Sequence, residues 1–148
     1  MRLIIKKICS DPWIYDIPLS HNPCPDNSFS GYFLNNNKLA AIARVYGNKK
    51  SNTVELADIY VADEFRGKIA PNNKKWSYNL MNSILNAIRR RNIKKIWLWT
   101  TNDNIPAIKL YERFGFKLQS FPNNKKIQLY KNHKWLKEKE LIYMTKLL

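Results

Sequence analysis

Two carboxylates lie in a segment whose other residues are mostly apolar, a setting that suits a general base. Glu55 and Asp58 belong to residues 53–61 (TVELADIYV), which are predicted to form a strand. Apolar surroundings strengthen a carboxylate as a base. Only one face of a strand points into a site, so the two compete for this role. For each, the alternative is an exposed position on the polar face.

A phenol and an amide lie further along the chain, in and before an amphipathic helix. Tyr111 offers a hydroxyl that can act as an acid or a hydrogen-bond donor, and Asn104 offers an amide. Each also has a structural interpretation, since Tyr111 falls in the apolar stripe of the helix and Asn104 stands where an N-cap is expected. The stripe consists of Ala107, Leu110, Tyr111 and Phe114.

The positive charge of the chain is confined to its second half. Residues 1–65 hold seven basic and seven acidic side chains, whereas residues 66–148 hold nineteen and four, which accounts for the whole net charge of +15. A one-sided cationic surface attracts nucleic acid, acidic protein or a phosphorylated cofactor. The alternative is a lysine-rich face that only contacts solvent.

Several classes of protein are excluded by composition. The four glycines are too scattered for a dinucleotide-binding fingerprint or a Walker phosphate loop. Cys9, Cys24, His21 and His133 do not have the spacing of a metal site, so we expect no metal and a reducing, cytoplasmic compartment. No apolar stretch approaches the roughly 20 residues of a membrane span, and no membrane partner is expected.

The first part of the chain predicts an antiparallel meander. Residues 1–8 read as an opening strand and residues 31–46 as a hairpin with an asparagine-rich turn. Prolines in the intervening residues 12–25 favour loops, which we expect to form a lid or substrate wall. In the carboxylate-bearing strand the alternation slips between Leu56 and Ile59, which predicts a β-bulge.

The strongest helix signal runs from about residue 75 to residue 91. Its predicted buried face comprises Trp76, Leu80, Met81, Ile84, Leu85 and Ile88. Its predicted solvent face comprises Asn79, Asn82, Ser83, Asn86 and Arg90.

The remaining elements complete an α+β (mixed α/β) domain spanning residues 1–148, in which residues 54–101 form a right-handed βαβ crossover. After the first helix we expect a strand at 94–101, a second helix capped by Asp103 or Asn104 and ended by Gly115, and strands at 116–121 and 140–147. The lysine-rich stretch between the last two strands has no assigned structure.

Two stretches together resemble the GNAT-type N-acetyltransferases. They are residues 55–68 (ELADIYVADEFRGK) and residues 104–116 (NIPAIKLYERFGF), with the amphipathic helix between them. The resemblance covers residues 53–121, and the strand at 140–147 is similar to the closing strand of that family. It implies a central mixed sheet with splayed middle strands, flanked by helices. It also implies direct transfer of acetyl from acetyl-coenzyme A to a primary amine.

The resemblance also implies roles for particular residues. The backbone of Ile59, Tyr60 and Val61 would hold the pantetheine arm and polarise the thioester, and Tyr111 would protonate or hydrogen-bond the leaving sulfur. Asn104 would contact the cofactor arm. The family often has an acidic residue on the strand near the splay, a place for which Glu55 and Asp58 remain the candidates.

The loop expected to bind the phosphates departs from the family pattern. Arg66, Gly67 and Lys68 match its beginning, but the loop that follows is longer and lacks the later glycines. Our hypothesis is that basic side chains supply charge where backbone wrapping is reduced, with a hydroxyl near the helix start as a further donor. These residues are Lys68, Lys74, Lys75 and Ser77. The alternative is a degenerate loop that no longer binds acetyl-coenzyme A.

The function predicted from the sequence is therefore an acetyl-coenzyme A-dependent N-acetyltransferase. Its acceptor would be a small molecule, an amino-acid derivative or a protein N-terminus. One alternative is a nucleic-acid-binding module that uses residues 89–91, Lys94, Lys95 and the lysines of 125–139 against phosphates. Another is a catalytically silent coenzyme A-binding protein on the same fold.

Overall fold

The computed structural model describes residues 1–7, 28–47, 52–137 and 139–148. The expectations for Cys9, Cys24 and the proline-containing segment 12–25 lie outside these residues. The described chain forms a seven-stranded sheet in the order β1-β2-β3-β4-β5-β7-β6. The strands are β1 (Ile4–Lys7), β2 (Phe29–Asn35), β3 (Lys38–Tyr46), β4 (Thr53–Val61), β5 (Lys95–Thr101), β6 (Lys117–Gln119) and β7 (Leu141–Leu147).

The sheet is mixed, as predicted. Strands β1 to β4 form an antiparallel meander, β4 and β5 are parallel, and β5, β7 and β6 are antiparallel again. The β2–β3 hairpin turns through Asn36 and Asn37, whose φ angles are 50° and 63°. Asparagine tolerates this left-handed conformation, so the predicted hairpin and its asparagine-rich turn are confirmed.

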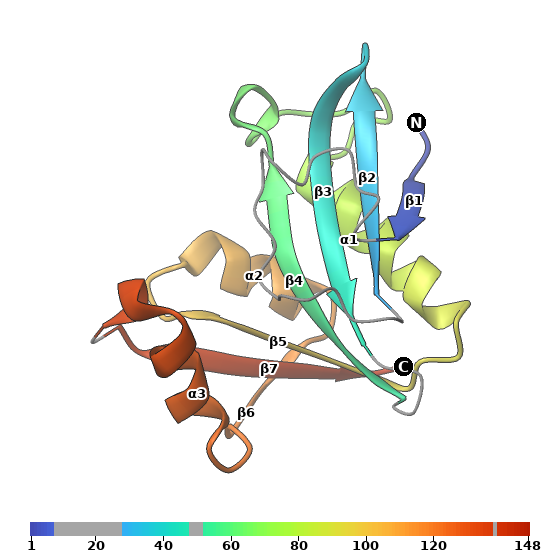
Figure 1. The fold of residues 1–148 in the computed structure, drawn as a ribbon. Coiled ribbons are helices and arrows are strands. Elements are labelled where there is room, and N and C mark those ends of the chain that lie inside the picture. Colours follow the sequence, from blue (N-terminus) through green and yellow to red (C-terminus); the bar gives the residue numbers. More distant parts are fainter. Residues whose placement is uncertain (8–27, 48–51, 138) are drawn as a thin grey trace.

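Helices cover both faces of the sheet (Figure 1). They are α1 (Trp76–Arg89), α2 (Ile105–Arg113) and α3 (Lys125–Asn132), with two 3-10 turns, η2 (Asp63–Phe65) and η3 (Lys134–Leu136). Helix α1 packs on β2, β3 and β4, and the rings of Tyr78 and Phe114 join α1 to the end of α2 at 5.1 Å. Ile96 and Leu98 of β5 belong to the same core, as does Tyr111.

The six predicted apolar positions of α1 are all buried. The prediction was wrong for Asn79, which was expected to face water but is only 6% exposed. Its amide is buried because it bonds to the loop that precedes the helix, as described below.

Helix α2 begins and ends near the predicted residues. Pro106 lies in its first turn, where a missing N–H leaves no bond unmade, and Gly115 follows its end with a φ of 89°. Asn104 occupies the N-cap position, but its side chain makes no capping hydrogen bond. The expected side-chain cap from Asp103 or Asn104 was therefore wrong.

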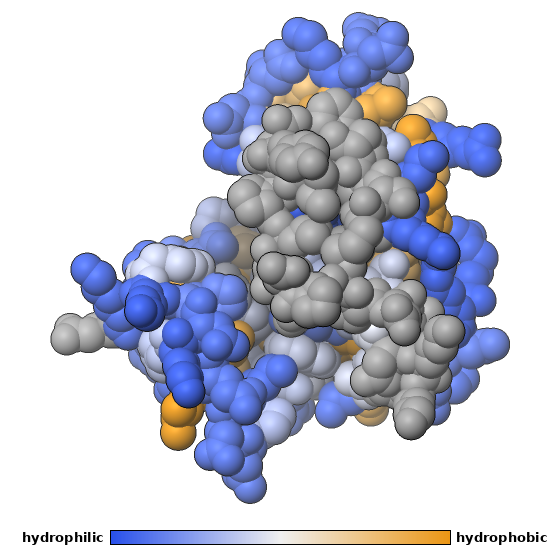
Figure 2. Space-filling model, viewed as in Figure 1, coloured by the Kyte–Doolittle hydropathy of each residue, from blue (hydrophilic) through white to orange (hydrophobic). Residues whose placement is uncertain are grey.

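The lysine-rich stretch without an assigned structure forms α3 and η3, on the sheet face opposite α1. The alternation of β5 explains why apolar surface is available on that face. Ile96 and Leu98 face α1, and Trp97 and Trp99 therefore face the opposite side of the sheet. Lys125 lies over the Trp97 ring at 4.2 Å. Hydrophilic residues predominate on the surface over α3 (Figure 2). No helix in the described ranges is both long and apolar enough to cross a membrane.

Candidate active site

Strands β4 and β5 separate partway along their length. They pair in register only at Thr53–Lys95, Val54–Ile96 and Glu55–Trp97. Beyond these pairs, β4 follows β3 to Val61, whereas β5 follows β7 to Thr101. Figure 1 shows the two strands diverging from their common end. The predicted splay of the middle strands is confirmed.

The predicted bulge lies on β4 at the start of the splay. Ile42 and Arg44 of β3 oppose Tyr60 and Ala57, so β4 holds one residue more than β3 over this interval. Asp58 has a φ of 51°, an unusual backbone conformation that aspartate accepts more readily than most residues. The bulge therefore sets the direction of the Asp58 carboxylate.

Two side chains of β3 hold that carboxylate. The Tyr46 hydroxyl donates a hydrogen bond of 2.6 Å to Asp58 Oδ2, and Arg44 Nη1 lies 3.7 Å from the same oxygen. The Arg44 side chain is fully buried, so its positive charge interacts with Asp58 with little screening. Arg44 and Tyr46 thus orient the Asp58 carboxylate.

A cavity of about 470 Å³ lies between the separated strands. It is lined by Leu56, Ala57, Asp58 and Ile59 of β4, Trp99, Thr100 and Thr101 of β5, Asn104, Tyr111 of α2, and His133 and Trp135. Tyr111 belongs to the core on the α1 side, whereas Trp99 packs with the cluster under α3. The cavity is therefore bordered by residues from both faces of the sheet.

Tyr111 is both a core residue and a cavity residue, so the two interpretations of its role are compatible. The residue is 7% exposed, and its ring packs on Phe116 at 6.0 Å. Burial raises the pKa of Tyr111 to about 12, because the phenolate loses solvation. At neutral pH the phenol is protonated and available as a proton donor.

Asn104 directs its side chain at β5 rather than at the helix. Its Nδ2 donates to Thr100 Oγ1 at 3.3 Å, and both residues line the cavity. The neighbouring Asp103 accepts a hydrogen bond from Thr101 and pairs with Lys139 Nζ at 3.0 Å. Hydrogen bonds from these two partners lower the pKa of the Asp103 carboxyl. These contacts tie the start of α2 to β5 and to the segment before β7.

The two competing carboxylates have different surroundings. Glu55 is 5% exposed, lies between Tyr46 and Trp97 in the sheet, and is not among the residues lining the cavity. Asp58 lines the cavity together with Tyr111. The fold therefore brings Asp58, and not Glu55, to the space between the strands.

The loop after β4 contains η2 and then a type II turn. Lys68 N–H donates to the Phe65 carbonyl at 3.1 Å, with Arg66 at φ −64° and ψ 127°. Gly67 takes a φ of 73°, which this turn requires at its third residue. Arg66 folds back, donating to the Val61 carbonyl at 3.0 Å and pairing with Asp63 at 3.0 Å. Arg66 thus connects the loop to the end of β4.

The additional part of the loop is attached to α1. Ala70 N–H donates to the Lys74 carbonyl at 2.8 Å, closing a small turn. Asn72 of that turn and Asn79 of α1 bond reciprocally through their amides, with Asn72 Nδ2 donating to Asn79 Oδ1 at 2.7 Å and Asn79 Nδ2 donating to Asn72 Oδ1 at 3.0 Å. Asn79 Nδ2 also reaches the Lys74 carbonyl at 3.3 Å. The sequence did not predict that Asn79 holds the loop. The one indication was its position next to Leu80 on the predicted buried face.

The start of α1 has the features of an anion site. Its N-cap residue, Lys75, makes no capping hydrogen bond with its side chain, and its first turn has no acidic residue. Lys68, Lys74 and Lys75 are exposed around it, and Ser77 is in the first turn. A helix N-terminus attracts phosphate through its backbone N–H groups and its dipole. The predicted phosphate-binding residues therefore gather at one end of α1.

His133 and Trp135 were missed as site residues. They come from the lysine-rich segment around η3, and no spacing in the sequence relates them to Tyr111 or Asp58. In the described part of the chain, no three His, Cys, Asp or Glu side chains gather as a metal site would require.

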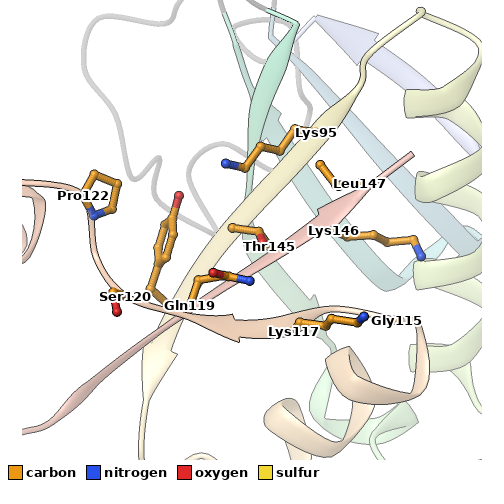
Figure 3. A pocket seen from close by; sticks show the side chains of 10 residues that line it. Lys95, Gly115, Lys117, Gln119, Ser120, Pro122, Thr145, Lys146 and Leu147 are labelled. Atoms are coloured by element: carbon orange, nitrogen blue, oxygen red, sulfur yellow. The ribbon is translucent and has the colours of Figure 1, made fainter.

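A second cavity of about 470 Å³ lies beside β5, β6 and β7, and contains none of the predicted site residues (Figure 3). Three lysines line it, but Figure 3 shows Lys95 extending away from Lys117 and Lys146. Their ammonium groups do not converge on one position, so this cavity lacks the geometry of an anion site.

Comparison with known proteins agrees with this geometry. The model of the acetyltransferase (GNAT) family matches residues 6–116, whereas no curated protein matches the sequence. Among solved structures, the IAA acetyltransferase from Bacillus cereus has a TM-score of 0.68 at 15% identity, and the match covers 99% of this chain and 100% of that one.

Two further structures share the fold. The Bacillus subtilis acetyltransferase in complex with CoA has a TM-score of 0.68 at 16% identity, over 99% of this chain and 98% of that one. The ribosomal-protein-alanine N-acetyltransferase from Brucella melitensis has a TM-score of 0.63 at 17% identity, over 83% of this chain and 70% of that one. Together with the family match over most of its length, the splayed sheet shows that this chain belongs to the GNAT family of acetyltransferases.

Proposed function

We propose that this protein is an N-acetyltransferase that transfers acetyl from acetyl-coenzyme A directly to a primary amine. The observation that carries the proposal is the cavity between β4 and β5, which brings the Asp58 carboxylate and the Tyr111 phenol to one space. The acetyl donor is acetyl-coenzyme A, because the chain is a GNAT acetyltransferase and a structural relative was solved with CoA.

The diphosphate of the donor would bind where α1 begins. The turn of Arg66, Gly67 and Lys68 leads into this region, and Lys74 and Lys75 add positive charge beside Ser77. Charge and the helix dipole favour phosphate here even without the glycines that usually wrap it. The basic second half of the chain strengthens this attraction.

The pantetheine arm would run along β4 into the splay. Ile59, Tyr60 and Val61 follow the bulge and lie beyond the last residue that pairs with β5. Their backbone would supply hydrogen bonds to the arm and to the thioester oxygen as negative charge develops on it. Asn104, whose amide faces the cavity, would contact the arm from the other wall.

The reaction needs a neutral amine and a proton for the departing sulfur. The amine first loses its ammonium proton, and its lone pair then attacks the carbonyl carbon of the thioester. As the C–N bond forms and the C–S bond breaks, Tyr111 donates its hydroxyl proton to the sulfur. The second nitrogen proton returns to the Tyr111 oxygen. The products are the amide, the thiol and one proton released to water, and the raised pKa of Tyr111 keeps its phenol protonated between turnovers.

Asp58 is our candidate for accepting the ammonium proton, directly or through a water molecule. It lines the cavity, whereas Glu55 lies outside it and would have to act from a distance. Arg44 and Tyr46 hold the Asp58 carboxylate in place, which favours a fixed hydrogen bond to the incoming amine.

The experiment that tests the proposal combines calorimetry with an amine screen. Acetyl-coenzyme A is titrated into the protein, and thiol release is then followed with a panel of primary amines. We expect binding heat and amine-dependent release of thiol together with an acetylated product. Binding without any transfer would instead indicate a silent coenzyme A-binding protein. Salt-sensitive binding to nucleic acid with no heat from acetyl-coenzyme A would favour the nucleic-acid module.

A further inference from the structure

The outer part of the cavity has an aromatic wall made by two distant segments. Trp99 comes from β5, and its ring packs against His133 with a centroid distance of 5.3 Å and an angle of 45°. Trp135 of η3 also lines the cavity, yet it remains 61% exposed. A large aromatic side chain left exposed beside a cavity offers apolar area that a ligand can cover.

This wall is held in place by its own small core. Leu129 of α3 and Leu136 of η3 are buried with Leu141, and Trp99 packs against them. The ion pair of Lys139 with Asp103 fastens the same segment to the start of α2. Trp99 and the short 3-10 turn that carries Trp135 are therefore in place before a ligand binds.

The charge of the cavity argues against a polycationic acceptor. Among its described lining residues Asp58 is the one acid, and the buried Arg44 lies 3.7 Å from that carboxylate. Binding a polyamine would require several carboxylates, because each ammonium group needs compensation when it leaves water. The net charge of +15 further disfavours the approach of a polycation.

We infer that the acceptor is a small monoamine carried on a flat, aromatic body. The ring covers Trp135 and Trp99, and the amine points inward to Asp58 and Tyr111, which border the same cavity. A volume of about 470 Å³ fits a small molecule together with the thioester end of the donor. The inference rests on the proposed function and adds the substrate class.

The test uses Trp135→Ala, with Ile127→Ala as a matched control. Both side chains are exposed on the same segment, at 61% and 68%, and Ile127 does not line the cavity. Calorimetry on the protein without any donor gives the affinities for 2-phenylethylamine, for ethylamine, which lacks the ring, and for spermidine. Steady-state assays with acetyl-coenzyme A then give kcat/KM for the same three amines.

We expect 2-phenylethylamine to bind most tightly of the three and to be the best acceptor. Trp135→Ala should weaken its binding and lower its kcat/KM by about tenfold or more, whereas Trp135→Phe should keep both within about threefold. Ile127→Ala should leave both unchanged. Ethylamine should be insensitive to every variant.

The outcomes separate this inference from the proposed function. If spermidine or ethylamine is acetylated as well as 2-phenylethylamine and Trp135→Ala changes nothing, the substrate class is overturned while the acetyltransferase stands. If 2-phenylethylamine binds in a Trp135-dependent way but no amine is acetylated, the aromatic subsite stands and the proposed function fails. Equal binding of the three amines to the wild-type protein would also overturn the inference.

Discussion

Replacing Asn79 by alanine is expected to weaken acetyl-coenzyme A binding without touching the reacting atoms. The side chain lies in the first half of α1 and makes its hydrogen bonds to the loop extension, two with Asn72 and one with the Lys74 carbonyl. Those bonds hold the loop that carries Lys74 and Lys75 against the start of the helix. Losing them frees the loop while leaving the cavity at β4 and β5 unchanged.

The magnitude follows from these contacts. Each net hydrogen bond contributes about 1 kcal/mol, so three contribute about 3 kcal/mol. Alanine has a higher helix propensity than asparagine, which offsets about 0.7 kcal/mol of this loss. The remaining 2 kcal/mol or so corresponds to about a 30-fold change in the equilibrium between attached and released loop. This is an upper limit for the rise in KM of acetyl-coenzyme A, and kcat should change much less.

The assay pairs steady-state kinetics with hydrogen exchange. Asn82→Ala is the matched control, because Asn82 lies on the same helix but is exposed. We expect Asn79→Ala to raise the KM for acetyl-coenzyme A by between about tenfold and 30-fold, and to speed exchange of the Ala70 amide, which bonds to Lys74. Faster exchange at Ala70 with an unchanged KM would refute the link between the attached loop and donor binding. Unchanged exchange would refute the role of Asn79 in holding the loop.

Three further predictions concern the reacting groups and the turn. Tyr111→Phe should keep the fold and lower kcat by about 100-fold in steady-state kinetics; an unchanged kcat would remove the phenol from the mechanism. Asp58→Asn should lower kcat/KM and change its pH profile more than Glu55→Gln does, because only Asp58 lines the cavity; the reverse order would assign the base to Glu55. Gly67→Ala should strain a turn with a φ of 73° by about 1 kcal/mol, although a Cβ there meets no atom within 4 Å. This strain should raise the KM for acetyl-coenzyme A. A KM equal to that of the wild type would show that the turn can change without loss of binding.

Local patterns in the sequence predicted much of the sheet and the main helices. The slip of alternation between Leu56 and Ile59 predicted the bulge at Asp58, because a bulge shifts the side-chain period by one residue. The spacing of apolar residues predicted the buried face of α1 for the same kind of reason. Such patterns are reliable because the backbone geometry of a strand or a helix by itself sets the period at which its side chains face the core.

The partners of polar side chains were decided by tertiary contacts. Asn79 was predicted to face water, because nothing in the helix pattern indicates that a loop residue seven positions earlier bonds to it. Asn104 occupies the expected cap position, yet its amide bonds to Thr100 of β5 instead of capping the helix. The choice between these partners depends on how close the elements come, which local spacing does not encode.

The sequence alone determined the family-like strand and helix motifs, the charge asymmetry and the candidates Tyr111, Glu55 and Asp58. Only the tertiary structure distinguished Asp58 from Glu55 and brought His133 and Trp135 to the same cavity. The cavity exists because β4 and β5 stop pairing after Glu55 and follow different neighbours. Its walls are therefore set by contacts between segments far apart in the chain, whereas the strands themselves are set by neighbouring residues.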